Sequence, residues 1–150
     1  MQMVFNELNT QRVRAGLLFN MPKILITGAL GLCGEEARYF FKEKGWEVYG
    51  IDNKARSGFF NIEYEFMEET CNEVHNIDIR NEKEINDLFK EIKFNAIAHF
   101  AAQPSHDYSK DHALEDFDIN ARGTLILLEA TRKYCPDAVF VFCSTDKVLL

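Results

Sequence analysis

Several patterns are absent from this 150-residue sequence, and each absence excludes a class of protein. No apolar run is long enough to cross a bilayer, and residues 1–20 lack the apolar core of a signal peptide, so we expect no membrane association. The 17 lysines and arginines are outnumbered by 24 acidic residues, which gives a net charge of −7. Because no basic cluster is available to meet a phosphate backbone, we expect no nucleic-acid partner.

The spacing of the cysteines indicates neither a disulfide framework nor a metal centre. The four cysteines lie at positions 33, 71, 135 and 143, and no two of them form a Cys-x-x-Cys pair. We therefore predict no metal site, reduced thiols and a cytoplasmic location. Cys33 and Cys143 stand in apolar contexts and are expected to be small core residues.

The sequence does contain a regular alternation of apolar runs and amphipathic stretches. Strands are predicted at 23–27, 47–51, within 73–79, 94–100 and 138–143. Helices are predicted at 32–44, from Asn81 onward and at 114–134, with a polar loop over 101–112. Apolar strands that alternate with helices indicate an α/β fold. We expect a doubly wound parallel sheet, an incomplete Rossmann fold of about five strands with helices on both faces.

Three glycines stand at the joint between the first predicted strand and the first predicted helix, at positions 28, 31 and 34. The N-terminus of a helix has unpaired N–H groups and a partial positive charge, but a phosphate reaches it only where the backbone is bare. Gly28 permits a tight turn, Gly31 leaves room for a pyrophosphate, and Gly34 allows close helix packing. The strand–turn–helix context therefore predicts a dinucleotide site.

An acidic residue ends the second predicted strand. Asp52 follows Gly34 by eighteen residues, where a carboxylate can accept hydrogen bonds from both ribose hydroxyls and repels a 2′-phosphate. The predicted cofactor is therefore NAD rather than NADP. The alternative is that Asp52 is a solvated turn residue, since Asp-Asn is a common turn pair.

Further candidates follow the third and fourth strands. Asp78 is expected near the adenine ring, and its alternative role is that of a carboxylate at the start of the next helix. Phe100, Ala101 and Ala102 follow the fourth strand. Small residues there let a dinucleotide lie across the carboxyl ends of the strands, although they equally suit close packing of the loop.

These motifs together resemble the extended short-chain dehydrogenase/reductases, which include the nucleotide-sugar epimerases and dehydratases. The segment TGALGLCG at 27–34 has the TGxxGxxG spacing of that family. The resemblance continues through Asp-Asn at 52–53 with Arg56, Asp-Ile-Arg at 78–80, His-Phe-Ala-Ala at 99–102, Asn120 and CSTDKV at 143–148. The segments AAQPSHD at 101–107 and STDKV look most like the CDP-paratose 2-epimerase (CDP-tyvelose epimerase) branch.

The resemblance implies a tightly held NAD that takes a hydride from a sugar carbon and returns it to the other face. The substrate implied is a nucleotide sugar, with a CDP-sugar favoured, and a homo-oligomer is a further expectation. The implied cofactor-binding residues are Gly28, Gly31, Leu32, Gly34, Asp52, Asn53, Arg56, Asp78, Ile79, Phe100, Ala101 and Ala102.

Other residues take their expected roles from the same resemblance. Thr145 aligns with the hydroxyl residue that hydrogen-bonds the reacting oxygen, and its alternative role is to cap the end of a strand. Gln103 and Ser105 lie in the loop that would cover the nicotinamide end and are candidates for sugar contacts. Asn120 is expected to hydrogen-bond backbone. His106 with Asp107 is open between a sugar contact and a solvated pair.

The general base of the family, a tyrosine in a Tyr-x-x-x-Lys pair, has no counterpart in this sequence. Residues 21–150 are therefore interpreted as the N-terminal part of an NAD-binding Rossmann domain, with its C-terminal part and the substrate domain absent. Residues 1–20 are interpreted as a poorly ordered extension. We predict little or no activity for this polypeptide alone. The alternatives are part of a dehydratase or decarboxylase, and a non-catalytic NAD(P)-binding module.

Overall fold

A computed structural model describes residues 21–55 and 70–144 of the chain. Its elements are β1 (Lys23–Thr27), α2 (Leu32–Glu43), β2 (Glu47–Asp52), β3 (Glu73–Asn76), α3 (Glu82–Glu91), β4 (Ala96–His99), α4 (His106–Asp111), α5 (Ala113–Phe117), the π-helical η2 (Asp118–Gly123), α6 (Thr124–Tyr134) and β5 (Val139–Phe142). The predicted extension at 1–20, Arg56 and Thr145 lie outside the described residues.

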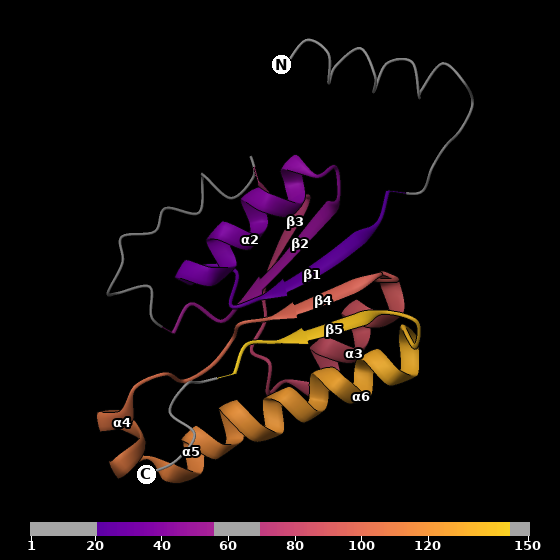
Figure 1. Cartoon of the computed structure of the whole chain (residues 1–150). Helices are drawn as coiled ribbons and strands as arrows, with labels where there is room; N and C mark the ends of the chain where they lie inside the picture. Colours follow the sequence, from indigo (N-terminus) through magenta and orange to yellow (C-terminus); the bar gives the residue numbers. More distant parts are fainter. Residues whose placement is uncertain (1–20, 56–69, 145–150) are drawn as a thin grey trace, which may run out of the picture.

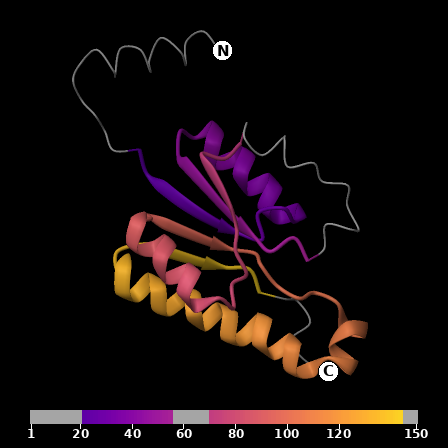
Figure 2. The same ribbon diagram turned by 180° about the vertical axis from the view of Figure 1, so that it is seen from behind.

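The five strands form one parallel sheet in the order β3-β2-β1-β4-β5 (Figure 1). The chain builds outward from β1 to β3 and then crosses back to place β4 on the other side of β1. Helix α2 covers one face of the sheet, while α3 and α6 lie side by side on the other, as the reverse view in Figure 2 also shows. The predicted doubly wound parallel sheet is therefore confirmed, and its switch point lies between β1 and β4.

Strand β1 is buried on both faces because its side chains alternate between two apolar clusters. Leu25 packs into the cluster that includes Phe89 of α3 and Leu127 of α6. Ile24 and Ile26 pack into the opposite cluster, against α2. Each such fully buried side chain contributes about 1.5–3 kcal/mol to folding. The carboxyl end of β1 is thereby held at the middle of the sheet, where the glycine turn begins.

One local prediction was wrong, and another was right except for one turn. The loop over 101–112 contains the short helix α4, which begins where the Ser105 hydroxyl accepts a hydrogen bond from the Tyr108 backbone N–H. The helix at 114–134 is interrupted by the π-helical η2. At Gly123, the last residue of η2, an added Cβ would lie 2.7 Å from Cδ1 of Ile79. Because Gly123 has no side chain, η2 can pack closely against Ile79.

Burial also differs from the predictions at several apolar residues. Cys33 and Cys143 are exposed rather than buried in the core, because Cys33 lies on the outer side of the first turn of α2 and Cys143 follows an edge strand. Strand β5 is that edge strand, paired only with β4 among the described strands. Its residues Val139 and Val141 are 62% and 52% exposed, as the position of the strand at the edge of the sheet allows.

Candidate dinucleotide-binding site

The structure gives a different reason for glycine at each of the three positions in the turn after β1. Gly28 has φ of +67°, and an added Cβ would lie 2.7 Å from the backbone N of Ala101. At Gly34 an added Cβ would overlap the carbonyl oxygen of Gly28, so this glycine is required for close packing of α2 on the turn. Gly31 has φ of −77°, and the nearest atom to its added Cβ is the Gly28 oxygen at 3.3 Å. The fold therefore needs glycine at 28 and 34, whereas at 31 an added Cβ would make a single tight contact with one backbone oxygen.

The N-terminus of α2 is bare. Its N-cap residue is Gly31, which provides no side-chain hydrogen bond to the first turn. Helices α3 and α4, by contrast, are capped by the side chains of Asn81 and Ser105. Unpaired N–H groups at a helix N-terminus attract an anion. The turn thus has the bare backbone and the electrostatics that a pyrophosphate requires, and Leu32, the first residue of α2, is 81% exposed beside it.

Asp52 lies against this turn. Its Oδ2 accepts a hydrogen bond from the Leu30 backbone N–H at 3.1 Å, and its Oδ1 accepts one from the Lys54 N–H at 2.9 Å. A carboxylate oxygen can accept two hydrogen bonds, so each oxygen keeps one position for a ribose hydroxyl. The carboxylate therefore supports the turn and still fits the sugar of a dinucleotide.

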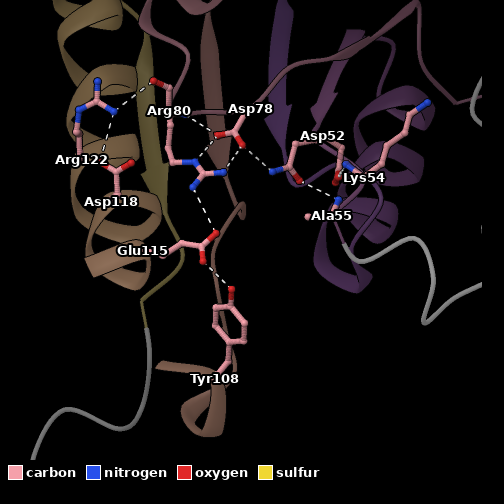
Figure 3. Close-up of polar contacts among 10 residues, drawn as sticks. Asp52, Lys54, Ala55, Asp78, Arg80, Tyr108, Glu115, Asp118 and Arg122 are labelled. Atoms are coloured by element: carbon pink, nitrogen blue, oxygen red, sulfur yellow. Dashed lines mark hydrogen bonds and ion pairs between the residues drawn. The ribbon is translucent and has the colours of Figure 1, made fainter. Parts of the chain in front are cut away.

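Asp78 belongs to a polar chain that crosses the carboxyl edge of the sheet (Figure 3). Its Oδ1 accepts hydrogen bonds from the backbone N–H and Nε of Arg80, and its Oδ2 accepts them from Arg80 Nη2 and from Asn53 Nδ2. The Arg80 guanidinium is the main cause of an Asp78 pKa lowered to about 2. These four donors use the acceptor capacity of the carboxylate, so direct contact of Asp78 with an adenine ring stays a prediction.

The polar contacts of Asp78 and Arg80 continue to the segment after β4. Arg80 Nη1 lies 3.6 Å from Oε1 of Glu115 in α5, and the Tyr108 hydroxyl of α4 donates to Glu115 Oε2 at 2.6 Å (Figure 3). These contacts connect the expected adenosine side of the site with α4. The Asp-Ile-Arg motif pointed to Arg80, whereas no sequence signal pointed to Glu115 or Tyr108.

The segment after β4 lies beside the glycine turn. The Phe100 N–H donates to the Thr27 carbonyl at 3.1 Å, and the Ala101 N–H donates to Thr27 Oγ1 at 3.1 Å. The Asn120 side-chain amide accepts a hydrogen bond from the Gln103 N–H and donates one to the Gln103 carbonyl, in agreement with its predicted supporting role. Gln103 Nε2 donates to the Ser105 carbonyl, so these two sugar-contact candidates lie together.

The remaining candidates lie apart from the glycine turn or inside the protein. His106 and Asp107 are exposed on α4, and Asp107 pairs with Lys110 at 3.2 Å, which favours the solvated alternative. Ile79 is 5% exposed and packs in the core. Within 21–55 and 70–144, no group of three or more His, Cys, Asp or Glu side chains gathers to hold a metal ion. In that same part of the chain, no helix is long and apolar enough to cross a membrane.

An open parallel sheet, with a bare glycine turn at its switch point and an acid at the end of the next strand, defines a dinucleotide-binding protein of the Rossmann class. Comparison with known proteins gives the particular family. Residues 24–149 match the NAD dependent epimerase/dehydratase family, and the chain belongs to it. NAD is the cofactor of this family, which confirms the cofactor prediction at the level of the family.

Individual relatives agree with this assignment. The chain is 34% identical over 127 residues to CDP-paratose 2-epimerase of Salmonella typhi, covering 84% of this chain and 37% of that protein. It is 35% identical over 119 residues to GDP-mannose 4,6-dehydratase of Yersinia enterocolitica, covering 75% and 32%. UDP-glucose 4-epimerase of Thermus thermophilus, solved in complex with NAD, superposes with a TM-score of 0.70 at 30% identity, covering 82% and 37%. The chain thus spans about a third of the length of these relatives.

Proposed function

We propose that this chain is the NAD-binding portion of a nucleotide-sugar epimerase. The observation that carries the proposal is the uncapped start of α2, where Gly28, Gly31 and Gly34 leave the backbone of the turn bare of side chains. In this proposal the turn at 28–34 binds the pyrophosphate, and Asp52 and Asn53 bind the adenosine ribose. Phe100, Ala101 and Ala102 flank the dinucleotide. Bound NAD would supply reversible hydride transfer at a sugar carbon.

The substrate proposed is a CDP-sugar. Support comes from the 34% identity to the CDP-paratose 2-epimerase of Salmonella typhi and from the segment AAQPSHD at 101–107. A nucleotide-sugar dehydratase is the second candidate, favoured by the 35% identity to GDP-mannose 4,6-dehydratase. Gln103, Ser105 and Thr145 are proposed to meet the sugar. The free cysteines support a cytoplasmic location as part of the same proposal.

Cofactor titration of the full chain tests the proposal. Wild type is expected to bind NAD more tightly than NADP, measured by calorimetry. Asp52→Asn, which keeps the size of the side chain and removes its charge, should weaken NAD binding about tenfold, the value of one charge-assisted hydrogen bond. Asp87→Asn is the matched control, because Asp87 pairs with Lys83 and Lys90 on the exposed surface of α3. A preference for NADP, or equal affinities of the two Asn variants, would reject the assignment.

A homo-oligomer is also proposed. Leu114, Phe117 and Leu125 on α5 and α6 are 87%, 64% and 58% exposed, which is unusual for large apolar side chains that follow one another along a helix. Sedimentation of the full chain should show self-association that Leu125→Glu weakens. Glu129→Gln, an exposed change on the same helix, is the control. A wild-type chain that sediments as a monomer at all concentrations would contradict this proposal.

A further inference from the structure

A buried histidine at the end of β4 lies at the centre of a hydrogen-bond chain, and none of the site predictions gives this histidine a role. The His99 side chain belongs to a residue that is only 1% exposed. Its Nδ1 lies 2.6 Å from Oγ1 of Thr27, the last residue of β1, and its Nε2 lies 2.9 Å from Oγ1 of Thr124, the first residue of α6. One imidazole thus connects the ends of two neighbouring strands to the helical layer beneath them.

Counting donors and acceptors along this chain determines which ring nitrogen carries the proton. The single hydroxyl proton of Thr124 is donated to the Asn120 carbonyl at 2.6 Å, so Thr124 Oγ1 must accept from His99 Nε2–H. A neutral imidazole has only one N–H, which makes Nδ1 an acceptor for the Thr27 hydroxyl. Thr27 Oγ1 in turn accepts the Ala101 N–H. Each hydroxyl and ring nitrogen of this hydrogen-bond chain then has a partner while His99 is neutral. This agrees with its burial, which lowers the pKa of His99 to about 4.

Both ends of this hydrogen-bond chain, Thr27 and Thr124, contact groups that hold the segment after β4. At one end, Thr27 holds the Ala101 N–H, which lies so close to the glycine turn that only a glycine fits at position 28. At the other end, Thr124 holds the Asn120 carbonyl, and the Asn120 amide holds the N–H and C=O of Gln103 at 2.8 and 3.1 Å. The imidazole therefore lies between the two threonines whose hydrogen bonds lead to Ala101 on one side and, through Asn120, to Gln103 on the other.

We infer that His99 is a positioning residue which, as a neutral imidazole protonated on Nε2, holds residues 100–103 between the glycine turn and η2. This is the position that a cofactor lying across the strand ends requires. The consequence for cofactor binding rests on the proposed function. The tautomer of His99 and its role in positioning residues 100–103 do not depend on the proposed function.

The tautomer is measured on the full wild-type chain, labelled with ¹⁵N, from long-range ¹H–¹⁵N correlations of the imidazole rings at neutral pH. The nitrogen that carries the proton resonates far upfield of the bare one, so the two neutral forms are distinguishable. We expect His99 to be protonated on Nε2 and bare on Nδ1, whereas the exposed His106 and His112 serve as internal references for solvated rings. A proton on Nδ1, or a charged ring, overturns the inference.

The hold on the segment is measured with a matched pair of variants. Thr124→Val keeps the shape and removes the hydroxyl, which leaves His99 Nε2–H without its acceptor, and Thr124→Ser restores the hydroxyl. We expect Thr124→Val to speed amide hydrogen exchange at Ala101 and Gln103 about tenfold, the loss of roughly one hydrogen bond. Exchange at Leu25, inside β1, should be unchanged, and Thr124→Ser should exchange like wild type. Unchanged exchange at Ala101 and Gln103, or an equal effect at Leu25, overturns the inference.

Calorimetry with NAD separates this inference from the proposed function. Thr124→Val should weaken NAD binding about tenfold while Thr124→Ser stays near wild type. If wild type binds no NAD, the proposed function fails, and the tautomer and exchange results still decide the role of His99. If Thr124→Val binds NAD as wild type does, the positioning role is wrong.

Discussion

Alanine at the glycines of this chain should separate the needs of the fold from those of the cofactor. Gly28 and Gly45 both have positive φ, at +67° and +80°, so alanine at either must adopt a left-handed backbone. The added Cβ at Gly45 has no atom within 4 Å, whereas at Gly28 it meets three backbone atoms of residues 100 and 101 at 2.7–2.9 Å. Gly45→Ala is therefore a control for backbone strain without a clash.

The expected magnitudes follow from these distances. Left-handed backbone costs an alanine about 1–2 kcal/mol, which is the whole expected effect of Gly45→Ala. Overpacking against backbone that cannot move adds about 1–3 kcal/mol, so Gly28→Ala should cost about 2–5 kcal/mol. The assay is urea unfolding followed by far-UV circular dichroism, with variants compared at an unchanged m-value. If Gly28→Ala costs no more than Gly45→Ala, the close approach of residues 100–101 to the turn is wrong.

Gly31→Ala completes the series, because position 31 has an ordinary φ and an added Cβ there would make one tight contact, 3.3 Å from the Gly28 oxygen. We expect a loss of stability below about 1 kcal/mol, the usual difference between glycine and alanine at an N-cap. The methyl group would nevertheless stand where a pyrophosphate approaches the first turn of α2, and NAD affinity should fall at least about tenfold. A Gly31→Ala variant that folds and binds NAD like wild type would reject the proposed pyrophosphate site.

Three further outcomes are expected. Arg80→Met should raise the Asp78 pKa from about 2 toward its ordinary value, although the residue 80 backbone N–H and Asn53 still donate to the carboxylate. Because a lowered carboxylate pKa stabilises the fold above the unfolded pKa, the loss of stability for this partly exposed pair should be about 1 kcal/mol near neutral pH and should vanish as pH falls through 2. Urea midpoints between pH 2 and 6 measure this loss. The pKa of His99 is lowered from 6.5 to about 4, so this residue destabilises the fold as pH falls from 6.5 to 4, by up to about 3 kcal/mol in total. His99→Gln does not titrate and should remove this pH dependence of the unfolding free energy. An unchanged pH dependence would show that His99 does not titrate in this range. The full chain should not turn over a CDP-sugar, because its sequence has no Tyr-x-x-x-Lys pair; product detected by chromatography would contradict this.

The sheet and the glycine turn could be predicted because their signals are local. Apolar runs of strand length alternate with amphipathic stretches, and three glycines stand at fixed spacing where one run meets a helix. The switch point then follows from the handedness of the crossovers. The helix predicted from Asn81 onward is α3, and the Asn81 side chain caps it by accepting a hydrogen bond from the Glu84 N–H.

The hydrogen-bond partners of the site could not be predicted, because they come from distant parts of the chain. Thr27 and His99 are 72 residues apart, and His99 and Thr124 are 25 apart. His99 is the first residue of the His-Phe-Ala-Ala motif, but the motif does not show which groups its ring nitrogens contact. Asp78 shows the same limit, since its motif pointed to adenine while its carboxylate is occupied by Arg80 and Asn53. Only the fold shows which of the acceptors remain for a ligand.

In the 114–134 region, apolar residues at helical spacing predict the helix correctly but do not show which side of the helix packs on the sheet. Leu114, Phe117 and Leu125 recur on one side, yet they are exposed, and α6 packs on the sheet through Leu127 and Ala130 instead. A helix with apolar residues around more than one side must cover two surfaces. The sheet covers one of them in this chain. The other is the surface on which the proposed self-association depends, and Leu125 lies on it while Leu127 does not.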